Sequence, residues 1–125
     1  MMTKLIQLNT WQSALGSVLE NFIKDQHADI LMLQEVLSSP HGQTLYFDKL
    51  QNIQKKSELE HIFFSSLLAH DFQNLKTYYG NAILSKFPFL ESYKEFTHLN
   101  YNDNWNPEKD SDEMKLFQHA VVNIS

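Results

Sequence analysis

Hydrophobic and polar residues at the start of the chain alternate in a way that predicts strand, helix and strand. Residues 5–8 form an apolar run too short for a helix, which predicts a strand ending near Asn9. Residues 15–23 show helical spacing, and residues 28–36 form a continuous apolar run typical of a strand covered on both faces. The expected buried face of the helix consists of Leu15, Val18, Leu19, Phe22 and Ile23. This order predicts a right-handed βαβ unit with two parallel strands.

The rest of the chain has weaker patterns. A second helix is expected at residues 43–56. Residues 69–77 and 97–115 are mixed or polar and are expected to be loops, and Tyr79–Asn81 is a turn signal. Four more strands are expected from composition, at residues 62–67, 82–85, 90–96 and 116–124. No turn or partner strand is expected after the last of these strands.

Length and composition predict one soluble domain. The 125 residues contain no cysteine, which excludes disulfides and thiolate metal sites. Neither a membrane-spanning run nor a signal peptide is recognisable, so a cytoplasmic location is expected. The net charge is −5, and all ten basic residues are lysine. Broad attraction to nucleic acid phosphates is therefore not supported, although a bound divalent metal would let an acidic protein act on phosphate esters.

Glu35 is the carboxylate of most chemical interest. It stands at the end of an otherwise apolar strand, where burial without a partner would be costly. One interpretation is a ligand for Mg²⁺, which prefers oxygen donors; the other is an exposed residue where the strand leaves the sheet. Asn9 follows the first strand and could orient a metal-bound water or a phosphate oxygen, or simply form a turn. Because parallel strands end at the same edge of a sheet, Asn9 and Glu35 are expected to lie together.

The histidines and aromatic residues give less specific signals. The six histidines show no metal-binding spacing, but His41 follows Glu35 closely and could approach the same edge. Four aromatic residues could stack on a base or sugar, or else pack in the core or on the surface: Trp11, Tyr78, Tyr79 and Trp105.

Three segments together resemble the endonuclease/exonuclease/phosphatase superfamily, which has the DNase I-like fold. Residues 4–11 (KLIQLNTW) are similar to the opening strand of that superfamily. Residues 28–36 (ADILMLQEV) resemble its motif of aspartate, isoleucine, hydrophobic residues, glutamine and glutamate. Residues 79–88 (YGNAILSKFP) resemble its G-N-A-I-L-S motif. The order and separation of the three segments make the resemblance specific.

The resemblance implies a fold, a reaction and a set of site residues. The fold would be α/β (α+β) with a mixed sheet, forming half of a four-layer α-β-β-α sandwich. Glu35 and Asn9 would be catalytic and metal-binding residues, and Asn81 and His41 would bind substrate. The cofactor would be Mg²⁺ (or Mn²⁺), and the substrate a phosphate ester: nucleic acid, phospholipid or small phosphate.

Motifs of the second half of the superfamily are missing from the sequence. Neither G-D-x-N nor S-D-H occurs, although these would supply the water-activating aspartate and the catalytic histidine. Residues 1–125 are therefore expected to be the N-terminal half of a phosphoesterase domain, inactive as an isolated chain. Two alternatives stay open. One is a non-catalytic assembly module that pairs or self-associates through an exposed sheet edge; the other is a stand-alone domain in which Glu35 is structural.

Overall fold

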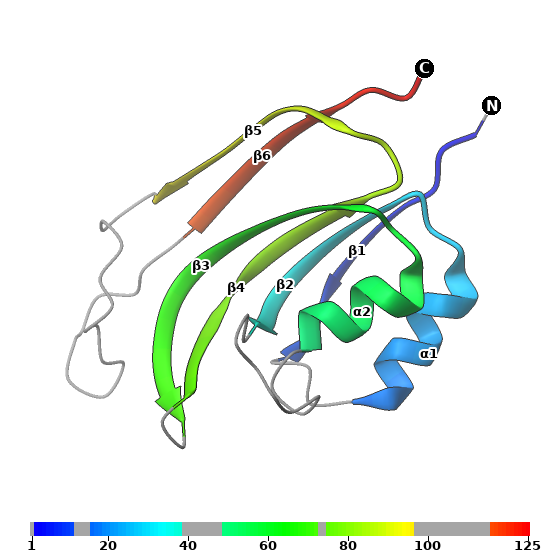
Figure 1. Cartoon of the computed structure of the whole chain (residues 1–125). Coiled ribbons are helices and arrows are strands. Elements are labelled where there is room, and N and C mark those ends of the chain that lie inside the picture. Colours follow the sequence, from blue (N-terminus) through cyan, green and yellow to red (C-terminus); the bar gives the residue numbers. More distant parts are fainter. Residues whose placement is uncertain (1, 12–15, 39–48, 73–74, 97–115) are drawn as a thin grey trace.

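A computed structural model describes residues 2–11, 16–38, 49–72, 75–96 and 116–125. The loop predicted at 97–115 lies outside the described residues. Two helices and six strands form within them (Figure 1). In chain order they are β1 (Leu5–Asn9), α1 (Ser17–Gln26), β2 (Ile30–Ser38), α2 (Lys49–Ser57), β3 (His61–Phe72), β4 (Leu75–Ser85), β5 (Phe89–Phe96) and β6 (Leu116–Val122).

The main sheet is mixed, as the sequence predicts. Its strand order is β1-β2-β4-β3, with β1 parallel to β2 and the other two pairings antiparallel. The helices α1 and α2 cover one face of this sheet, and the two-stranded sheet of β5 and β6 lies over the other face (Figure 1). No helix among the described residues is both long enough and apolar enough to cross a membrane.

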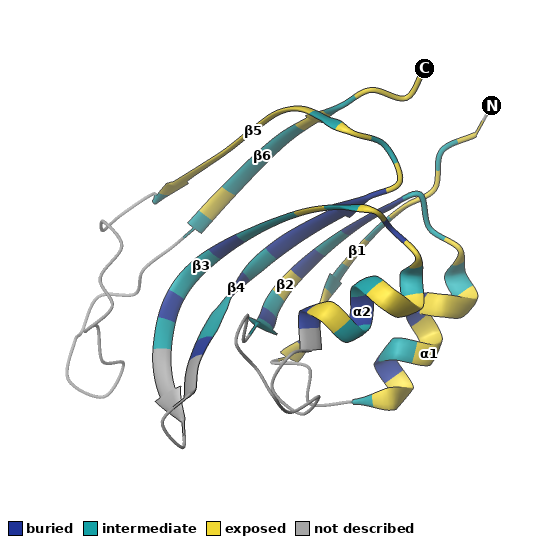
Figure 2. Cartoon of the chain, viewed as in Figure 1, coloured by how far each residue is buried: buried dark blue, intermediate teal, exposed yellow. Residues whose placement is uncertain are grey.

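The hydrophobic core lies between the helices and the main sheet (Figure 2). Its buried members are Leu19, Ile23, Leu31, Leu33, Val36, Leu50, Ile53, Leu59, Ala82 and Leu84. The predicted apolar face of α1 is too wide, because Val18 is 69% exposed and Phe22 is 46% exposed. A helix lying on a sheet buries one narrow stripe, and in α1 that stripe is the i, i+4 pair Leu19 and Ile23.

The loop at 69–77 and the turn at 79–81 are wrong predictions. β3 and β4 form one long antiparallel pair that runs from His61↔Ser85 to Phe72↔Leu75. Polar composition hid these strands, since backbone pairing along a ladder needs no apolar side chain. Gly80 lies inside β4 rather than in a turn, and its Cα comes so close to β3 that an added Cβ would be 2.0 Å from the carbonyl oxygen of Ser65.

The last strand does have a partner, contrary to the expectation of none. β6 pairs with β5 in antiparallel register, with Tyr93 opposite His119. Gln118 joins this small sheet to the main one. Its Nε2 donates to Ser65 Oγ at 2.8 Å, and it also lies 3.1 Å from the carbonyl oxygen of Asn81. The two sheets are thus linked by polar contacts at the level of Asn81.

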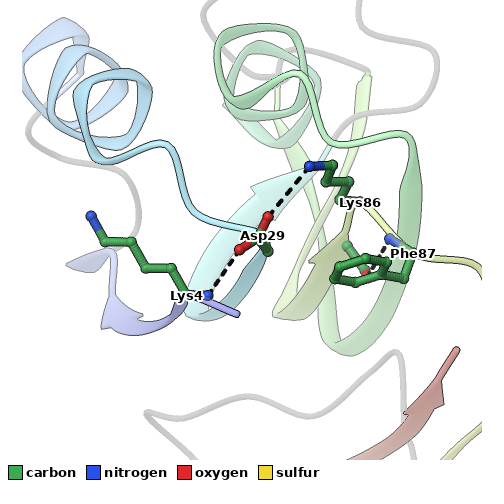
Figure 3. Close-up of polar contacts among 5 residues, drawn as sticks. Lys4, Asp29, Lys86 and Phe87 are labelled. Atoms are coloured by element: carbon green, nitrogen blue, oxygen red, sulfur yellow. Dashed lines mark hydrogen bonds and ion pairs between the residues drawn. The ribbon is translucent and has the colours of Figure 1, made fainter. Parts of the chain in front are cut away.

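Two of the three motifs also contribute contacts that hold strand ends together (Figure 3). Asp29 Oδ2 accepts the backbone N–H of Lys4 at 2.8 Å, and Oδ1 lies 3.6 Å from Lys86 Nζ. The N–H of Phe87 donates to Ser85 Oγ at 2.9 Å and shapes the turn after β4. These contacts fix the starts of β1 and β2 against the end of β4, so this part of the motifs has a structural role.

Candidate functional site

Three of the predicted site residues lie at one level of the main sheet. Asn9 in β1 pairs with Gln34 in β2. On the other side of β2, the pairs Leu33↔Ala82 and Val36↔Gly80 leave two residues, Gln34 and Glu35, opposite the single residue Asn81. Neighbouring strands β1, β2 and β4 therefore bring Asn9, Glu35 and Asn81 together. His41, the fourth predicted residue, lies outside the described residues.

Glu35 lies in a β-bulge and not at the end of its strand, since β2 continues to Ser38. The bulge changes which face each side chain takes. Strict alternation would put Glu35 on the core face with Leu31 and Leu33, but the extra residue gives that place to Val36, which is fully buried. Glu35 is half-buried, and its backbone has a φ of +57°, an uncommon value for a residue with a side chain. The bulge thus keeps the carboxylate out of the core at the cost of backbone strain.

Thr10 fixes the bulge from the β1 side. It is only 1% exposed, and its Oγ1 donates to the carbonyl oxygen of Glu35 at 2.8 Å. Its backbone N–H donates to the carbonyl oxygen of Gln34 at 2.9 Å. Sequence reasoning missed Thr10. The available signal was a small hydroxyl residue directly after Asn9, at a strand end predicted to lie beside Glu35.

Asn9 combines its two predicted roles. Its Oδ1 accepts the backbone N–H of Trp11 at 2.8 Å, and Trp11 takes a left-handed φ of 49°, so Asn9 does form a turn. The side chain of Asn9 is nevertheless exposed beside the bulge. A carbonyl oxygen has two lone pairs and the amide nitrogen has two hydrogens, so Asn9 can also contact a ligand.

Tyr79 is a site residue that the sequence did not identify. It lies on β4 two positions from Asn81, and the side chains of such residues share a face of the sheet. Its hydroxyl is hydrogen-bonded to the Glu35 side chain. Burial, and then the charge and hydrogen bond of Glu35, raise the pKa of Tyr79 to about 12. The hydroxyl is therefore protonated at neutral pH and donates to the carboxylate.

This shifted pKa predicts a pH dependence of stability. The folded-state pKa of about 12 exceeds the ordinary value of 10.0, so the stabilisation is fully present below pH 10 and is lost as pH rises from 10 towards 12. Chemical denaturation at pH 9 and pH 11 should show a larger loss of unfolding free energy in the natural chain than in Tyr79→Phe. Other tyrosines and lysines titrate in both proteins, so equal losses would contradict the assignment.

The donor atoms suit a hard cation with few protein ligands. Among the described residues no group of three or more His, Asp or Glu side chains is placed to hold a metal ion. The bulge offers one carboxylate, Glu35, with the amide oxygens of Asn9 and Asn81 on the adjacent strands. Mg²⁺ is commonly bound through one or two carboxylates while it keeps several waters, so this set fits Mg²⁺ (or Mn²⁺).

Comparison with known proteins identifies the family. The sequence pattern of the Endonuclease/Exonuclease/phosphatase family matches residues 6–118, nearly the whole chain. The chain belongs to the endonuclease/exonuclease/phosphatase family. Members of this family act on phosphate esters and are generally metal-dependent. No curated protein matches the chain.

Two solved structures share the fold. One is an endonuclease/exonuclease/phosphatase from Beutenbergia cavernae DSM 12333, with a TM-score of 0.68 and 14% identity over 98% of this chain. The other is an endonuclease/exonuclease/phosphatase family protein from Leptotrichia buccalis C-1013-b, with a TM-score of 0.60 and 14% identity over 98% of this chain. The chain spans 34% and 50% of these two proteins. The likeness confirms the predicted DNase I-like architecture over the part of the fold that this chain spans.

Proposed function

We propose that the bulge holds the metal-binding carboxylate of a phosphoesterase that hydrolyses phosphodiester or phosphomonoester bonds with Mg²⁺ (or Mn²⁺). One observation supports the proposal most strongly. Glu35 is held out of the core, in a strained backbone conformation, at the sheet level of Asn9 and Asn81. Strain of this kind persists where surrounding contacts enforce it, and it is concentrated at functional sites. The family supplies the reaction class, and this geometry supplies the reason to assign it to Glu35.

Each residue would have a separate task. The Glu35 carboxylate would bind the cation, which supplies positive charge next to the phosphoryl oxygens when bound. The Asn9 amide nitrogen can donate to a phosphate oxygen while Oδ1 keeps the turn to Trp11 in place. Asn81, opposite the bulge, can contact the substrate from β4. Thr10 and Tyr79 hold the backbone and the carboxylate of Glu35.

Metal binding by this chain can be measured through its stability. A cation that binds only the folded state raises the melting temperature, by an amount that grows with concentration. We expect Mg²⁺ or Mn²⁺ at millimolar concentration to raise the melting temperature of the natural chain but not that of Glu35→Gln. Glu60→Gln, which removes an exposed carboxylate just before β3, serves as the matched control and should respond like the natural chain. No shift in the natural chain would contradict the proposal and favour a structural Glu35.

Residues 1–125 are proposed to be the N-terminal half of the phosphoesterase domain. The sequence offers Glu35 and Asn9 but lacks the G-D-x-N and S-D-H motifs whose side chains would move protons. We therefore expect the 125-residue chain with Mg²⁺ to show no turnover of DNA, RNA or nitrophenyl phosphates above buffer. Turnover that Glu35→Ala abolishes would contradict the expected inactivity while supporting the role of Glu35.

A non-catalytic assembly module is the second candidate. Within the described residues β1 is an edge strand of the main sheet, and three large hydrophobic residues of β1 and α1 are exposed: Leu5, Val18 and Phe22. Such features favour pairing with another chain, here a second copy. Light scattering coupled to size-exclusion chromatography decides this, since a monomer at all concentrations would contradict self-association.

A further inference from the structure

Tyr79 occupies a rigid position between two irregularities of the main sheet. Its cross-strand partners are Leu37 in β2 and Leu68 in β3. One bulge, at Gln34 and Glu35, lies on the β2 side, and the pairing with β3 shifts between Ser66 and Leu68. Bulges locally increase twist and redirect side chains. Here they flank the short stretch of β4 that contains Tyr79 and Asn81.

The aromatic ring of Tyr79 has little freedom to move. The side chain is half-buried, and its neighbours on both sides are leucines at paired positions. Immediately after it, Gly80 lies so close to Ser65 that not even a methyl group would fit between the strands. The β4 backbone therefore cannot slide against β3, and the hydroxyl is presented from a fixed strand.

Glu35 is held at two points. Thr10 binds its backbone carbonyl at 2.8 Å and thereby fixes where the side chain starts. The Tyr79 hydroxyl is bonded to the side chain and fixes where it ends. An ionised carboxylate has about four lone-pair sites, so one hydrogen bond leaves the others for a cation.

We propose that Tyr79 is a positioning residue whose hydroxyl sets the orientation of the Glu35 carboxylate for binding a divalent cation. This inference rests on the proposed function of Glu35. Mg²⁺ and Mn²⁺ need well-ordered oxygen ligands, and hydrogen-bonding partners of metal ligands raise affinity by fixing those ligands. Without the hydroxyl, the long Glu35 side chain would sample other rotamers, and the cation would bear the cost of ordering it.

Mn²⁺ binding to the 125-residue chain, measured by electron paramagnetic resonance, tests the inference. Four proteins are compared: the natural chain, Tyr79→Phe, Tyr78→Phe and Glu35→Gln. Tyr78 is the matched control because it is adjacent in β4 but paired with Ser38, so it lies on the opposite face. We expect Tyr79→Phe to bind about 10- to 100-fold more weakly than the natural chain, with Tyr78→Phe unchanged and Glu35→Gln not binding. Melting temperatures without metal show that the variants are folded.

The outcomes separate the inference from the proposed function. Equal Mn²⁺ affinity in the natural chain and Tyr79→Phe overturns the positioning role and leaves Glu35 as the ligand. Binding that survives in Glu35→Gln, or no binding in the natural chain, overturns both. A second measurement needs no change to Tyr79: in chains labelled with ¹³C at tyrosine Cζ, Glu35→Gln should shift the Tyr79 signal and not the Tyr78 signal. If neither signal moves, the hydrogen bond and the inference are wrong.

Discussion

Replacement of Gly80 by alanine should destabilise the folded chain by about 3 kcal/mol or more, because overpacking against fixed backbone is not relieved by a rotamer change. The new Cβ would be 2.0 Å from the Ser65 carbonyl oxygen, 2.9 Å from the Ser65 carbonyl carbon and 3.0 Å from the Ser66 Cα. All three atoms belong to the backbone of β3, so the two strands would have to separate. Separation would also displace Tyr79 and Asn81, the neighbours of Gly80 at the site.

Chemical denaturation gives the measurement, and Gly16→Ala gives the control. Gly16 has a φ of +51° but has no atoms within 4 Å of an added Cβ. Its substitution should therefore cost only the dihedral strain, about 1 kcal/mol. If Gly80→Ala costs no more than Gly16→Ala, the close approach of β4 to β3 is wrong, and with it the rigid placement of Tyr79.

Removal of the Glu35 side chain should separate function from stability. We expect Glu35→Ala and Glu35→Gly both to lose Mn²⁺ affinity by more than the roughly 10- to 100-fold that loss of a ligand's hydrogen-bonding partner costs. Between the two, the glycine variant should be more stable without metal by about 1 kcal/mol, because the φ of +57° is unfavourable for alanine and costs glycine nothing. This reverses the usual order, in which glycine inside a strand is the less stable choice.

The pair of variants is self-controlled. Both remove the carboxylate and its bond to Tyr79, so a difference in unfolding free energy between them reports the backbone strain at Glu35 alone. A more stable alanine variant would contradict the strained bulge. Unchanged Mn²⁺ affinity in either variant would contradict the role of the carboxylate.

The sequence was sufficient for the parts of the fold that depend on local periodicity. The parallel pairing of β1 and β2 and the buried stripe of α1 follow from apolar spacing, although the exposure of Val18 and Phe22 does not. The β3–β4 pair was missed around residues 69–77 because its partner residues are polar and their pairing is non-local. Composition cannot report which strands pair when the backbone alone makes the ladder.

The site was predictable in its residues but not in its geometry. Asn9, Glu35 and Asn81 stand in recognisable motifs, and the register brings them to one level. The bulge was not predictable, because apolar residues occupy both alternating positions of β2 before Gln34 and leave its buried face ambiguous. Thr10 and Tyr79 were missed for the same reason: their contacts with Glu35 exist only once the bulge has turned that residue out of the core.

The most direct test locates the bound cation. In ¹⁵N-labelled protein, substoichiometric Mn²⁺ broadens the amide signals nearest to it. The account predicts that the signals of Thr10, Glu35 and Asn81 disappear first, and that Glu35→Gln preserves them at the same Mn²⁺ concentration. Broadening that begins elsewhere in the chain, or that is the same in Glu35→Gln, would contradict the assignment of the bulge as the metal-binding centre.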